Sequence, residues 1–433
     1  MLDVVVIGGG PAGSTTATLL AKKGFSVALL ERDQFPRFQI GESLLPFNND
    51  LFDQLGVREQ LESTGAASFP KHGAEFVTGD GKVSYVFRFA RHLSAAHSRS
   101  YQVKRAEFDH LLLRNAMAAG ADVRQRTAVC DIDLSARDRV SISAIDSEGK
   151  SQRFESRFVI DASGHGALIG TRLGEKREEA SLRKIAIFAH YSNLKDRPEG
   201  LDAGNTVIVI LRDAWFWLIP LSSEVTSVGL VVDRDLVTGA SVAPAQLLER
   251  MIRETPFLTT RMAEATRVTD IYVRKDFSYR MSRVVGRNFA MVGDAAGFFD
   301  PIFSTGVFMA MKTGQIVADA AESRLRTGSM RMLKTYQKSH SAALRRYFRF
   351  IHRFYRREFL EVFLQPAERF GLLPIIVSLL AGDVFESKRG RWRLFLFLAL
   401  TQIQKRKAII ARPIPWDTLP GARRSLISEE SFV

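Results

Sequence analysis

The chain has 433 residues, of which 46% are hydrophobic and 25% charged, and this predicts two or three coupled domains with a large core. A single cysteine, Cys130, excludes an intramolecular disulfide framework and a metal site built from several cysteines. Apolar runs such as residues 394–400 fall well short of the ~18–20 residues that a membrane span needs. Since Met1 leads directly into an expected strand, with no room for a signal peptide, we expect a cytoplasmic protein.

The formal net charge is +14, and the excess is concentrated in residues 331–412, which carry 18 Lys and Arg against 5 Asp and Glu. This distribution predicts either a solvated basic helical surface or a surface that docks an acidic partner or an anionic membrane. No nucleic-acid recognition motif accompanies the charge, so we expect no nucleic-acid partner.

The N-terminal segment has the pattern of a βαβ unit that binds a dinucleotide. A buried strand, a helix and a second strand are expected at residues 4–7, 11–23 and 25–30. Gly8 permits the turn, Gly10 lets the backbone approach a pyrophosphate, and Gly13 lets the helix pack closely on the strand. N–H groups at the helix start face the anion, and an acid after the second strand can hold ribose hydroxyls. The predicted contacts are Gly8, Gly10, Pro11, Ala12, Gly13, Glu31 and Arg32.

Residues 66–100 and 175–275 have a different pattern, in which apolar and polar residues alternate over short segments. This alternation predicts a mainly antiparallel sheet inserted into the dinucleotide-binding domain. Lys71 lies in a predicted loop just before Gly73 and a strand. A lysine there is either a surface charge or an amine whose pKa burial can tune.

Two later strands are expected to end beside the dinucleotide. Residues 158–164 predict a strand that ends near Asp161, and residues 289–294 predict a strand that delivers Asp294 to a helix start. At that point the carboxylate of Asp294 can accept hydrogen bonds from the hydroxyls of a bound cofactor.

Trp215 and Trp217 lie in the segment Trp-Phe-Trp-Leu-Ile-Pro that ends at Pro220. Considered alone, this segment predicts a strand at the edge of a sheet that runs into a proline turn. Two tryptophans two residues apart place both indoles on the same face of the strand. Indoles have no acid–base chemistry, so the pair considered alone predicts a hydrophobic core.

Residues 304–306, Ser-Thr-Gly, are expected to start a helix, where consecutive backbone N–H groups suit a small anion. After about residue 326 the chain is predicted to be helical, with aromatic residues at a spacing more typical of a core than of a binding surface. Pro413, Pro415 and Pro420 predict an extended tail.

Taken together, these motifs resemble the flavin-dependent halogenases. The resemblance rests on the glycine fingerprint, Trp-x-Trp-x-Ile-Pro, Phe-x-x-Pro-x-x-Ser-x-Gly at residues 298–306, and Arg-x-x-Phe-Asp at residues 105–109. It covers about residues 1–325 and implies an α/β fold. That fold has a Rossmann-like FAD-binding domain of the aromatic-hydroxylase (glutathione-reductase-like) type, an inserted mainly antiparallel β-sheet substrate domain and a helical C-terminal region. The expected FAD-binding parts are residues 1–65, 101–174 and 276–325, the substrate sheet is 66–100 and 175–275, and the basic C-terminal region is 326–433.

The resemblance also implies roles for particular residues. Lys71 would capture or activate a halogen that reduced FAD, oxygen and chloride or bromide deliver as hypohalous acid. A halide would bind at Ser304, Thr305 and Gly306, while Trp215 and Trp217 would separate the substrate from the flavin. Further flavin contacts would be Glu42, Ser43, Arg105, Asp161, Gly293, Asp294, Pro301 and Gly306. A separate flavin reductase would supply FADH2, because no second glycine fingerprint for NADPH is visible.

One departure from the family bears on the substrate. Tryptophan halogenases have a glutamate before the Ser-Thr-Gly turn, and this chain has Phe303, which would line the substrate pocket. The difference favours an electron-rich phenol or pyrrole, either free or tethered to an acidic carrier protein. His72, beside Lys71, is either a base for a phenol or a structural residue.

Two alternatives remain open at the level of sequence. An aromatic hydroxylase or a geranylgeranyl-reductase-like enzyme on the same scaffold would share most of the motifs, but it would not need an amine at Lys71. A flavin-binding protein without turnover would act through its basic C-terminal surface.

Overall fold

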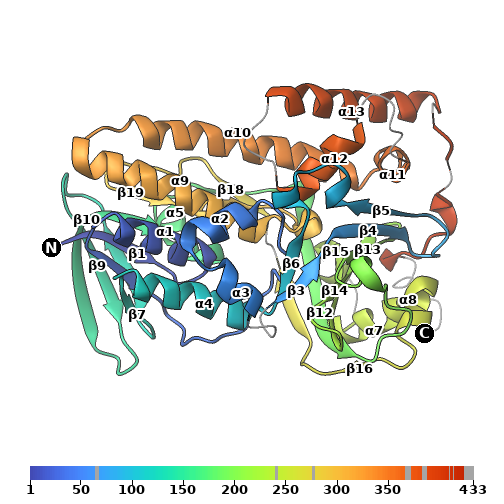
Figure 1. The fold of residues 1–433 in the computed structure, drawn as a ribbon, viewed down its shortest axis with the longest axis horizontal. Helices are drawn as coiled ribbons and strands as arrows, with labels where there is room; N and C mark the ends of the chain where they lie inside the picture. The colour runs from blue at the N-terminus through green and yellow to red at the C-terminus, as the bar shows by residue number, and fades with distance from the viewer. Residues whose placement is uncertain are drawn as a thin grey trace. The chain divides into compact units, whose positions relative to one another are not determined.

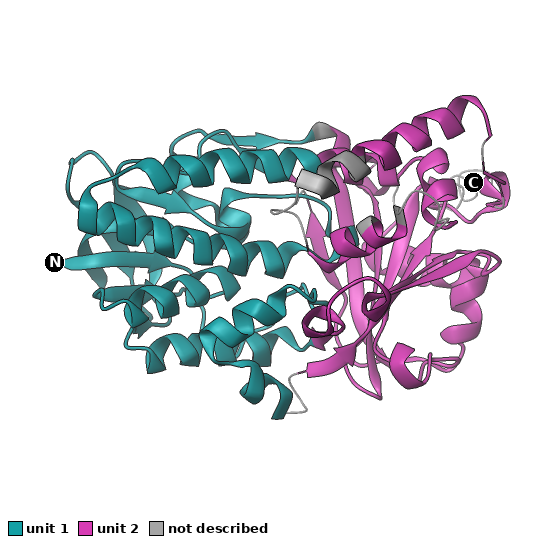
Figure 2. Cartoon of the chain, turned by 45° about the horizontal axis from the view of Figure 1, so that its top comes forward, with its two compact units in different colours: residues 1–67, 103–179, 279–346 teal, residues 68–102, 180–278, 347–433 magenta. Residues whose placement is uncertain are grey.

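The computed structural model describes residues 1–63, 68–238, 242–275, 278–365, 372–382, 388–408, 410–412 and 414–423, with side chains except at 180, 372, 375 and 388–394 (Figure 1). The chain divides into two compact units (Figure 2). The first unit comprises residues 1–67, 103–179 and 279–346, and the second comprises residues 68–102, 180–278 and 347–433. The expected boundaries near 65, 100, 174 and 275 lie close to these, whereas residues 326–433 are shared between the two units.

The first unit is built on a seven-stranded sheet in the order β7-β2-β1-β10-β9-β8, with β19 also paired to β10. Strands β7, β2, β1, β10 and β19 are parallel, and β9 runs antiparallel to both of its neighbours, β10 and β8. Its strands are β1 (Leu2–Ile7), β2 (Val27–Leu30), β7 (Asp122–Arg124), β8 (Ala128–Asp133), β9 (Val140–Ile145), β10 (Ser151–Asp161) and β19 (Phe289–Met291). The α/β class and the N-terminal βαβ unit predicted from sequence are confirmed.

Helices of the first unit include α1 and α9, which pack on each other. At Gly314 in α9, an added Cβ would lie 2.8 Å from the carbonyl oxygen of Ala12 in α1, so glycine permits this close approach. The helices are α1 (Pro11–Lys22), α2 (Asn48–Leu55), α3 (Arg58–Ser63), α4 (Arg105–Ala118), α5 (Leu168–Arg172), α9 (Gly306–Thr327) and the first part of α10 (Arg331–Phe354). A smaller sheet contains β11 (Lys176–Glu178), β18 (Tyr279–Met281) and β20 (Gly297–Phe298).

The second unit is built on an eight-stranded sheet in the order β16-β12-β15-β14-β13-β4-β5, with β17 also paired to β12. Only the β13–β4 pair among its described ladders is parallel. Its strands are β4 (Gly73–Thr78), β5 (Ser84–Arg88), β12 (Lys184–Ser192), β13 (Thr206–Ile210), β14 (Ala214–Pro220), β15 (Val225–Asp233), β16 (Thr266–Arg267) and β17 (Tyr272–Lys275). A separate pair joins β3 (Ser68–Lys71) to β6 (Ser100–Val103).

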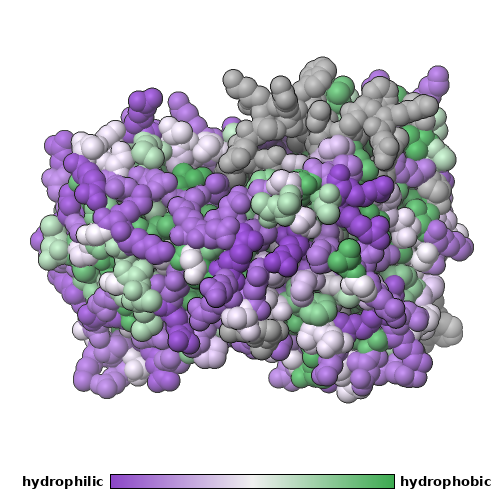
Figure 3. All heavy atoms as spheres, viewed as in Figure 1, coloured by the Kyte–Doolittle hydropathy of each residue, from purple (hydrophilic) through white to green (hydrophobic). Residues whose placement is uncertain are grey.

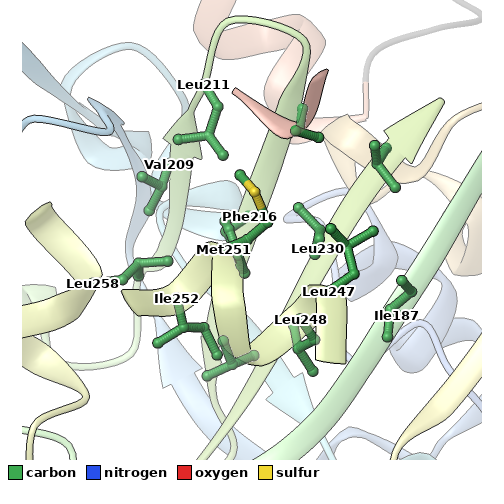
Figure 4. Packing of buried hydrophobic residues seen from close by; sticks show 14 of the residues in the cluster. Ile187, Val209, Leu211, Phe216, Leu230, Leu247, Leu248, Met251, Ile252 and Leu258 are labelled. Carbon is green, nitrogen blue, oxygen red and sulfur yellow. The ribbon is translucent and has the colours of Figure 1, made fainter. Parts of the chain in front are cut away.

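One face of this sheet packs on helices α7 (Pro244–Glu254) and α8 (Pro256–Arg261). Phe216 and Leu230 from the sheet meet Leu247 and Met251 from α7, and all four are fully buried (Figure 4). Burying an apolar side chain of this size stabilises the fold by about 1.5–3 kcal/mol. Because strand side chains alternate between faces, Trp215 and Trp217 belong to the opposite face, which we call the Trp face.

The C-terminal segments add helices to the second unit. The helices are α11 (Arg357–Phe363), α12 (Leu372–Ala381) and α13 (Lys388–Arg406), after α6 (Arg234–Thr238) earlier in the chain. Aromatic residues of α10 are buried as expected, with Phe350 and Phe354 at 3% and 2% exposure.

The predicted extended tail is wrong for residues 414–422. Pro420 accepts a hydrogen bond from the N–H of Arg212, and Asp213 accepts one from the N–H of Ala422, so this segment packs on the β13–β14 turn. Pro413 lies outside the described residues.

Hydrophilic residues predominate on the face shown in Figure 3. The exposed large hydrophobic residues in the described chain are scattered over both units, for example Met117, Leu201 and Phe395. Within the described residues, no helix is long and apolar enough to cross a membrane.

Candidate active site

The glycine loop of the first unit follows β1 and has no room for side chains at two positions. At Gly8, where φ is +100°, an added Cβ would lie 2.4 Å from the carbonyl oxygen of Ala162, and at Gly13 it would lie 1.8 Å from that of Gly8. Both distances are far below any normal contact, so these residues fix the turn and the packing of α1. The predicted roles of Gly8 and Gly13 in the turn and in helix packing agree with this geometry.

Gly10 is open by comparison. The nearest heavy atom to a Cβ built there is Nη2 of Arg37, at 3.6 Å. Pro11 and Ala12 begin α1 directly after it, so the first N–H groups of a twelve-residue helix are directed to this side. Helix N–H groups, a bare glycine backbone and a guanidinium fit the pyrophosphate of FAD. Arg37 was not predicted from the sequence, and its only signal there is a basic residue shortly after the second strand.

Glu31 and Arg32 end up in different surroundings. One carboxylate oxygen of Glu31 accepts the N–H of Gly9 at 2.6 Å, and the other accepts the N–H of Asp33 at 2.8 Å. Glu31 is therefore fixed against the glycine loop, where a ribose hydroxyl can share its lone pairs. The side chain of Arg32 is 75% exposed and faces Asp33 at 3.6 Å.

Arg105 opens α4 and lies in a buried network. Its guanidinium makes two 2.8 Å hydrogen bonds to the carboxylate of Asp109 one turn later, and it also donates to the carbonyl oxygens of Ile40 and Gly41. Gly41 has φ of +109°, and an added Cβ would lie 2.7 Å from Nη1 of Arg105. Arg105 therefore fixes the loop that carries Glu42 and Ser43, both of which are buried.

Asp161 ends β10 and is fully buried. Its carboxylate accepts the N–H and hydroxyl of Ser163 and the N–H of Ile169, so it organises the loop that follows the strand. Burial raises the pKa of Asp161 despite these hydrogen bonds. The structure thus places Asp161 beside the glycine loop, with its carboxylate used within the protein.

Asp294 follows β19 in a short 3-10 turn, Gly293–Ala296, where the sequence predicted a helix start. The reason is Gly293, whose φ of +57° breaks the helical path, and the long helix begins only at Gly306. The Asp294 carboxylate is 29% exposed and lies 3.8 Å from Nε2 of His165, which the sequence analysis missed. Desolvation raises the pKa of Asp294 even though His165 and Arg105 oppose the shift.

The segment in which the sequence predicted a halide site begins a helix, as expected. Pro301 to Phe303 form a 3-10 turn, Ser304 adopts a left-handed φ of +55°, and Gly306 is the first residue of the 22-residue α9. An added Cβ at Gly306 would lie 3.2 Å from the ring of Phe298, so the first turn of α9 packs against an aromatic. Phe303 is buried at 3% exposure.

Lys71 ends β3 in the second unit and is only 2% exposed. Its ammonium nitrogen lies 5.6 Å from the ring centre of Phe89. Burial lowers the pKa of Lys71 to about 7, because a charged amine loses solvation in this position. The structure therefore excludes the surface-charge interpretation of Lys71 and gives both amine and ammonium forms near neutral pH.

The backbone of His72 is held by a buried asparagine side chain. Its N–H donates to Asn205 Oδ1 at 3.2 Å, which fixes the backbone next to Lys71. Burial, together with the nearby charge of Arg99, lowers the pKa of the His72 imidazole.

The two indoles lie on one face of β14, as predicted. Their ring centres are 5.9 Å apart, and they are 2% and 5% exposed. Trp215 donates to the hydroxyl of Tyr355 at 2.9 Å, and Trp217 donates to Ser227 Oγ at 3.1 Å. The prediction of an edge strand is wrong: β14 lies between β13 and β15, and Pro220 ends it where a missing N–H does no harm.

Gly229 explains how Trp217 fits. This glycine is opposite Trp217 on β15, and an added Cβ would lie 2.1 Å from the indole. The Trp face is therefore packed closely around an aromatic layer that also includes Phe188, 5.6 Å from Trp217 between ring centres.

The chain is similar to known proteins in both sequence and fold. Residues 1–350 match the FAD binding domain family. The chain is 30% identical over 413 residues to the 1H-pyrrole-2-carbonyl-[peptidyl-carrier protein] chlorinase of Pseudomonas fluorescens, covering 89% of this chain and 90% of the relative. It is 33% identical over 328 residues to the corresponding brominase of Pseudoalteromonas luteoviolacea, covering 75% and 78%. The structure of the flavin-dependent brominase Bmp2 aligns with a TM-score of 0.83 at 27% identity, covering 94% of this chain and 100% of that chain.

The fold and the glycine cradle thus define an FAD-binding flavoprotein, and FAD is its cofactor. Within that class, the chain belongs to the flavin-dependent halogenases, which are oxidoreductases.

Proposed function

We propose that this enzyme installs chlorine or bromine on an electron-rich aromatic ring, a pyrrole or phenol, through the side chain of Lys71. The observation that carries the proposal is a lysine with 2% exposure and a pKa of about 7 in a chain of the halogenase family. Reduced FAD, bound at the glycine cradle and supplied by a separate flavin reductase, provides hypohalous acid from dioxygen and a halide.

The role of Lys71 is then defined by its two protonation states. The neutral amine attacks the halogen of hypohalous acid, forming an N–halogen bond and releasing water. The ring next attacks that halogen, and its displaced proton returns to the nitrogen, which regenerates the amine. The ammonium form can instead donate a hydrogen bond to hypohalous acid and so polarise it toward the ring. Only the amine route needs the depressed pKa, because a normal lysine would be almost wholly ammonium at pH 7.

Other residues prepare the reaction. The N–H groups at the start of α9, around Ser304, Thr305 and Gly306, suit a halide ion. The proposed flavin contacts are Glu42, Ser43, Arg105 and Pro301. Arg105 also positions the loop of Glu42 and Ser43, because it donates a hydrogen bond to the carbonyl oxygen of Gly41. Trp215 and Trp217 form a rigid aromatic layer that would keep the substrate from direct contact with the flavin.

A carrier-bound pyrrole is favoured over a free substrate. The two relatives named above act on pyrrole-2-carbonyl groups tethered to a peptidyl-carrier protein. In this chain, α10 contains no Asp or Glu, and its exposed side includes Arg331, Lys334, Lys338, Arg345 and Arg349. These cations lie along a helix about 36 Å long and suit an acidic protein partner. If the carrier docks there, complex formation weakens steeply with salt, whereas capture by anionic vesicles alone would favour a membrane contact.

The central test is substitution of Lys71. We expect Lys71→Ala to abolish halogenation, detected as the loss of the bromine isotope doublet in the product mass, while FAD binding and peroxide release persist. Product formed by Lys71→Ala at the wild-type rate would overturn the assignment. Hydroxylated product from the wild-type enzyme would instead favour an aromatic monooxygenase.

The pH profile separates the two forms of Lys71. Halogenation that rises through pH 7 and then levels off supports the amine route, and activity that falls above pH 7 supports the ammonium route. An Asn205→Ala variant serves as control, because Asn205 holds the backbone beside Lys71 without supplying a titratable group.

A further inference from the structure

A cluster of buried polar residues lies on the segments that pair with or hydrogen-bond to the chain at Lys71 in the second unit. Strand β6 is paired with β3, which ends at Lys71. Ser100 and Gln102 of β6 are 0% exposed, and Asn205 and Thr206 at the start of β13 are 1% and 3% exposed. Five polar side chains are thus removed from solvent within one region.

Residues 204–206 connect the members of this cluster. The amide nitrogen of Gln102 donates to the carbonyl oxygen of Gly204 and to Thr206 Oγ1, both at 2.8 Å. Gly204 lies against Pro70, since an added Cβ would be 1.7 Å from the Pro70 carbonyl oxygen. The chain on both sides of Lys71 and the amide of Gln102 are therefore fixed to the same short segment.

The cluster lies at one end of the Trp face. In the ladder between β13 and β14, Ile208 is opposite Trp217. Thr206 is two residues from Ile208 on the same strand and so shares its face. The Gln102 amide, bound to Thr206, therefore belongs to the sheet face that carries the two indoles.

Two atoms of the cluster have no hydrogen-bond partner among the residues that the structure describes. They are Ser100 Oγ and Gln102 Oε1. The amide nitrogen of Gln102 donates two hydrogen bonds, and these fix the orientation of the amide group. A buried polar atom left unpaired costs about 1–3 kcal/mol, so such atoms call for an explanation. Ser100 and Gln102 are alternate residues of a strand, so their Cα atoms are about 7 Å apart and their side chains share a side.

We infer that Ser100 and Gln102 bind the polar edge of the aromatic substrate, with Gln102 Oε1 accepting the ring N–H and the Ser100 hydroxyl donating to an adjacent carbonyl. This rests on the proposed function and specifies its substrate class: an N–H heteroaromatic ring that bears a carbonyl group. An amide oxygen is only an acceptor, so it selects a ring that donates a hydrogen bond and rejects one that does not.

Direct binding tests the inference without turnover. The probes are pantetheine thioesters of pyrrole-2-carboxylate and of N-methylpyrrole-2-carboxylate, titrated calorimetrically into the enzyme with oxidised FAD. N-methylation keeps the ring electron-rich but removes its donor. We expect the N-methyl probe to bind at least about 100-fold more weakly, because its methyl group leaves Gln102 Oε1 unpaired. Equal affinity for the two probes would overturn the role of Gln102.

Ser100→Ala tests the proposed hydrogen bond from the Ser100 hydroxyl to the substrate carbonyl. The melting temperature of the variant shows whether its fold is intact. Removing an unpaired buried hydroxyl is expected to leave the melting temperature unchanged or raised. We expect the pyrrole probe to bind about 10-fold more weakly to this variant. Thr226→Val is the matched control, since Thr226 Oγ1 is also buried without a partner but lies on the opposite face of the same sheet.

The outcomes distinguish the inference from the function on which it rests. If Ser100→Ala behaves like Thr226→Val, with stability retained and affinity unchanged, the Ser100 hydroxyl has no part in binding and the inference fails there. If the N–H dependence and the Ser100→Ala loss are both found but no halogenated product forms, the subsite stands and the halogenation chemistry is wrong.

Discussion

The two units differ in the hydrogen bonds and charges that accompany their buried polar groups. In the first unit, Asp109 is 0% exposed and its carboxylate receives three hydrogen bonds, two from Arg105 and one from Arg37 at 3.1 Å. In the second unit, the cluster near Lys71 contains an amine with a strongly lowered pKa and two polar atoms for which the described part of the chain offers no hydrogen-bond partner.

This difference teaches that burial serves two purposes in the same chain. Around Asp109, opposite charges at contact distance compensate the loss of water, and the network holds the loop of Glu42 beside the cofactor cradle. Around Lys71, burial lowers the pKa of the amine to about 7, so the loss of solvation dominates over the interactions that the amine makes. We therefore expect the buried network around Asp109 to stabilise the fold and the buried amine of Lys71 to destabilise it.

Asp109→Asn is expected to give the largest change in the free energy of unfolding. It leaves the guanidinium of Arg105 buried without its counter-charge, which is expected to lower the free energy of unfolding by about 3–5 kcal/mol. Denaturant titration measures the loss. The control is Asp53→Asn, whose partner Arg58 is reached by a carboxylate that is 59% exposed, and there we expect a change below about 1 kcal/mol. Similar losses in both variants would remove the distinction drawn for the first unit.

Lys71→Met is expected to raise the free energy of unfolding, whereas Asp109→Asn lowers it. The folded pKa is about 7 and the ordinary lysine value is 10.5, so between these values the unfolded chain binds the additional proton. Wild-type stability therefore rises with pH across this window, and the penalty of the buried charge is complete below pH 7. We expect Lys71→Met to be more stable by about 1–3 kcal/mol at pH 6, with the gain shrinking as pH approaches 10.

The measurement is the melting temperature of both proteins at pH 6 and pH 9.5. A destabilised Lys71→Met at pH 6 would mean that the lysine is held by compensating interactions, as Asp109 is. The contrast between the two units would then be lost.

Gly229→Ala sharpens the comparison on the Trp face. The new methyl group would lie 2.1 Å from Trp217, so the indole or its strand must shift. We expect a loss of about 1–3 kcal/mol and altered tryptophan fluorescence. Gly166→Ala is the control, since its nearest neighbour is Ser163 Oγ at an ordinary 3.5 Å. Unchanged fluorescence and stability at Gly229 would show that the aromatic layer is loose.

Tyr355→Phe should have the smallest effect. It removes the hydroxyl that accepts the N–H of Trp215 and links α10–α11 to the Trp face. The expected cost is about 0.5–1.5 kcal/mol, with a change in the tryptophan emission. Tyr336→Phe is a matched control, because its hydroxyl is also buried but donates to the carbonyl of Met291 in the first unit. Emission that moves equally in both variants would argue against a specific role for Tyr355.

Much of the first unit could be predicted from local patterns. Gly8, Gly10 and Gly13 follow a buried strand directly, and the physical constraint on each is set within a few residues, so their roles follow from the sequence. The start of α9 at Gly306 was likewise predictable. The helix start at Asp294 was predicted wrongly, because the positive φ of Gly293 is imposed by packing against Ala12 and Ala310 from distant helices.

The second unit was harder to predict because its site residues come together only through pairing. Residues 100–102 and 204–206 are about a hundred positions apart and have no shared motif, and Trp215 gave no sign of its partner Tyr355. The edge-strand prediction for residues 215–220 failed for the same reason, since the neighbours of a strand are set by the whole sheet.

The amino-acid sequence by itself determined the dinucleotide cradle and the family, and it singled out Lys71 as the residue proposed to react. These depend on backbone constraints and residue chemistry that act over short stretches of chain. Only the tertiary structure decided that Lys71 is buried with a pKa near 7 and that Ser100 and Gln102 lie unpaired in the same cluster. Desolvation and hydrogen-bond pairing depend on every segment that surrounds a group, and those segments are brought together only by the fold.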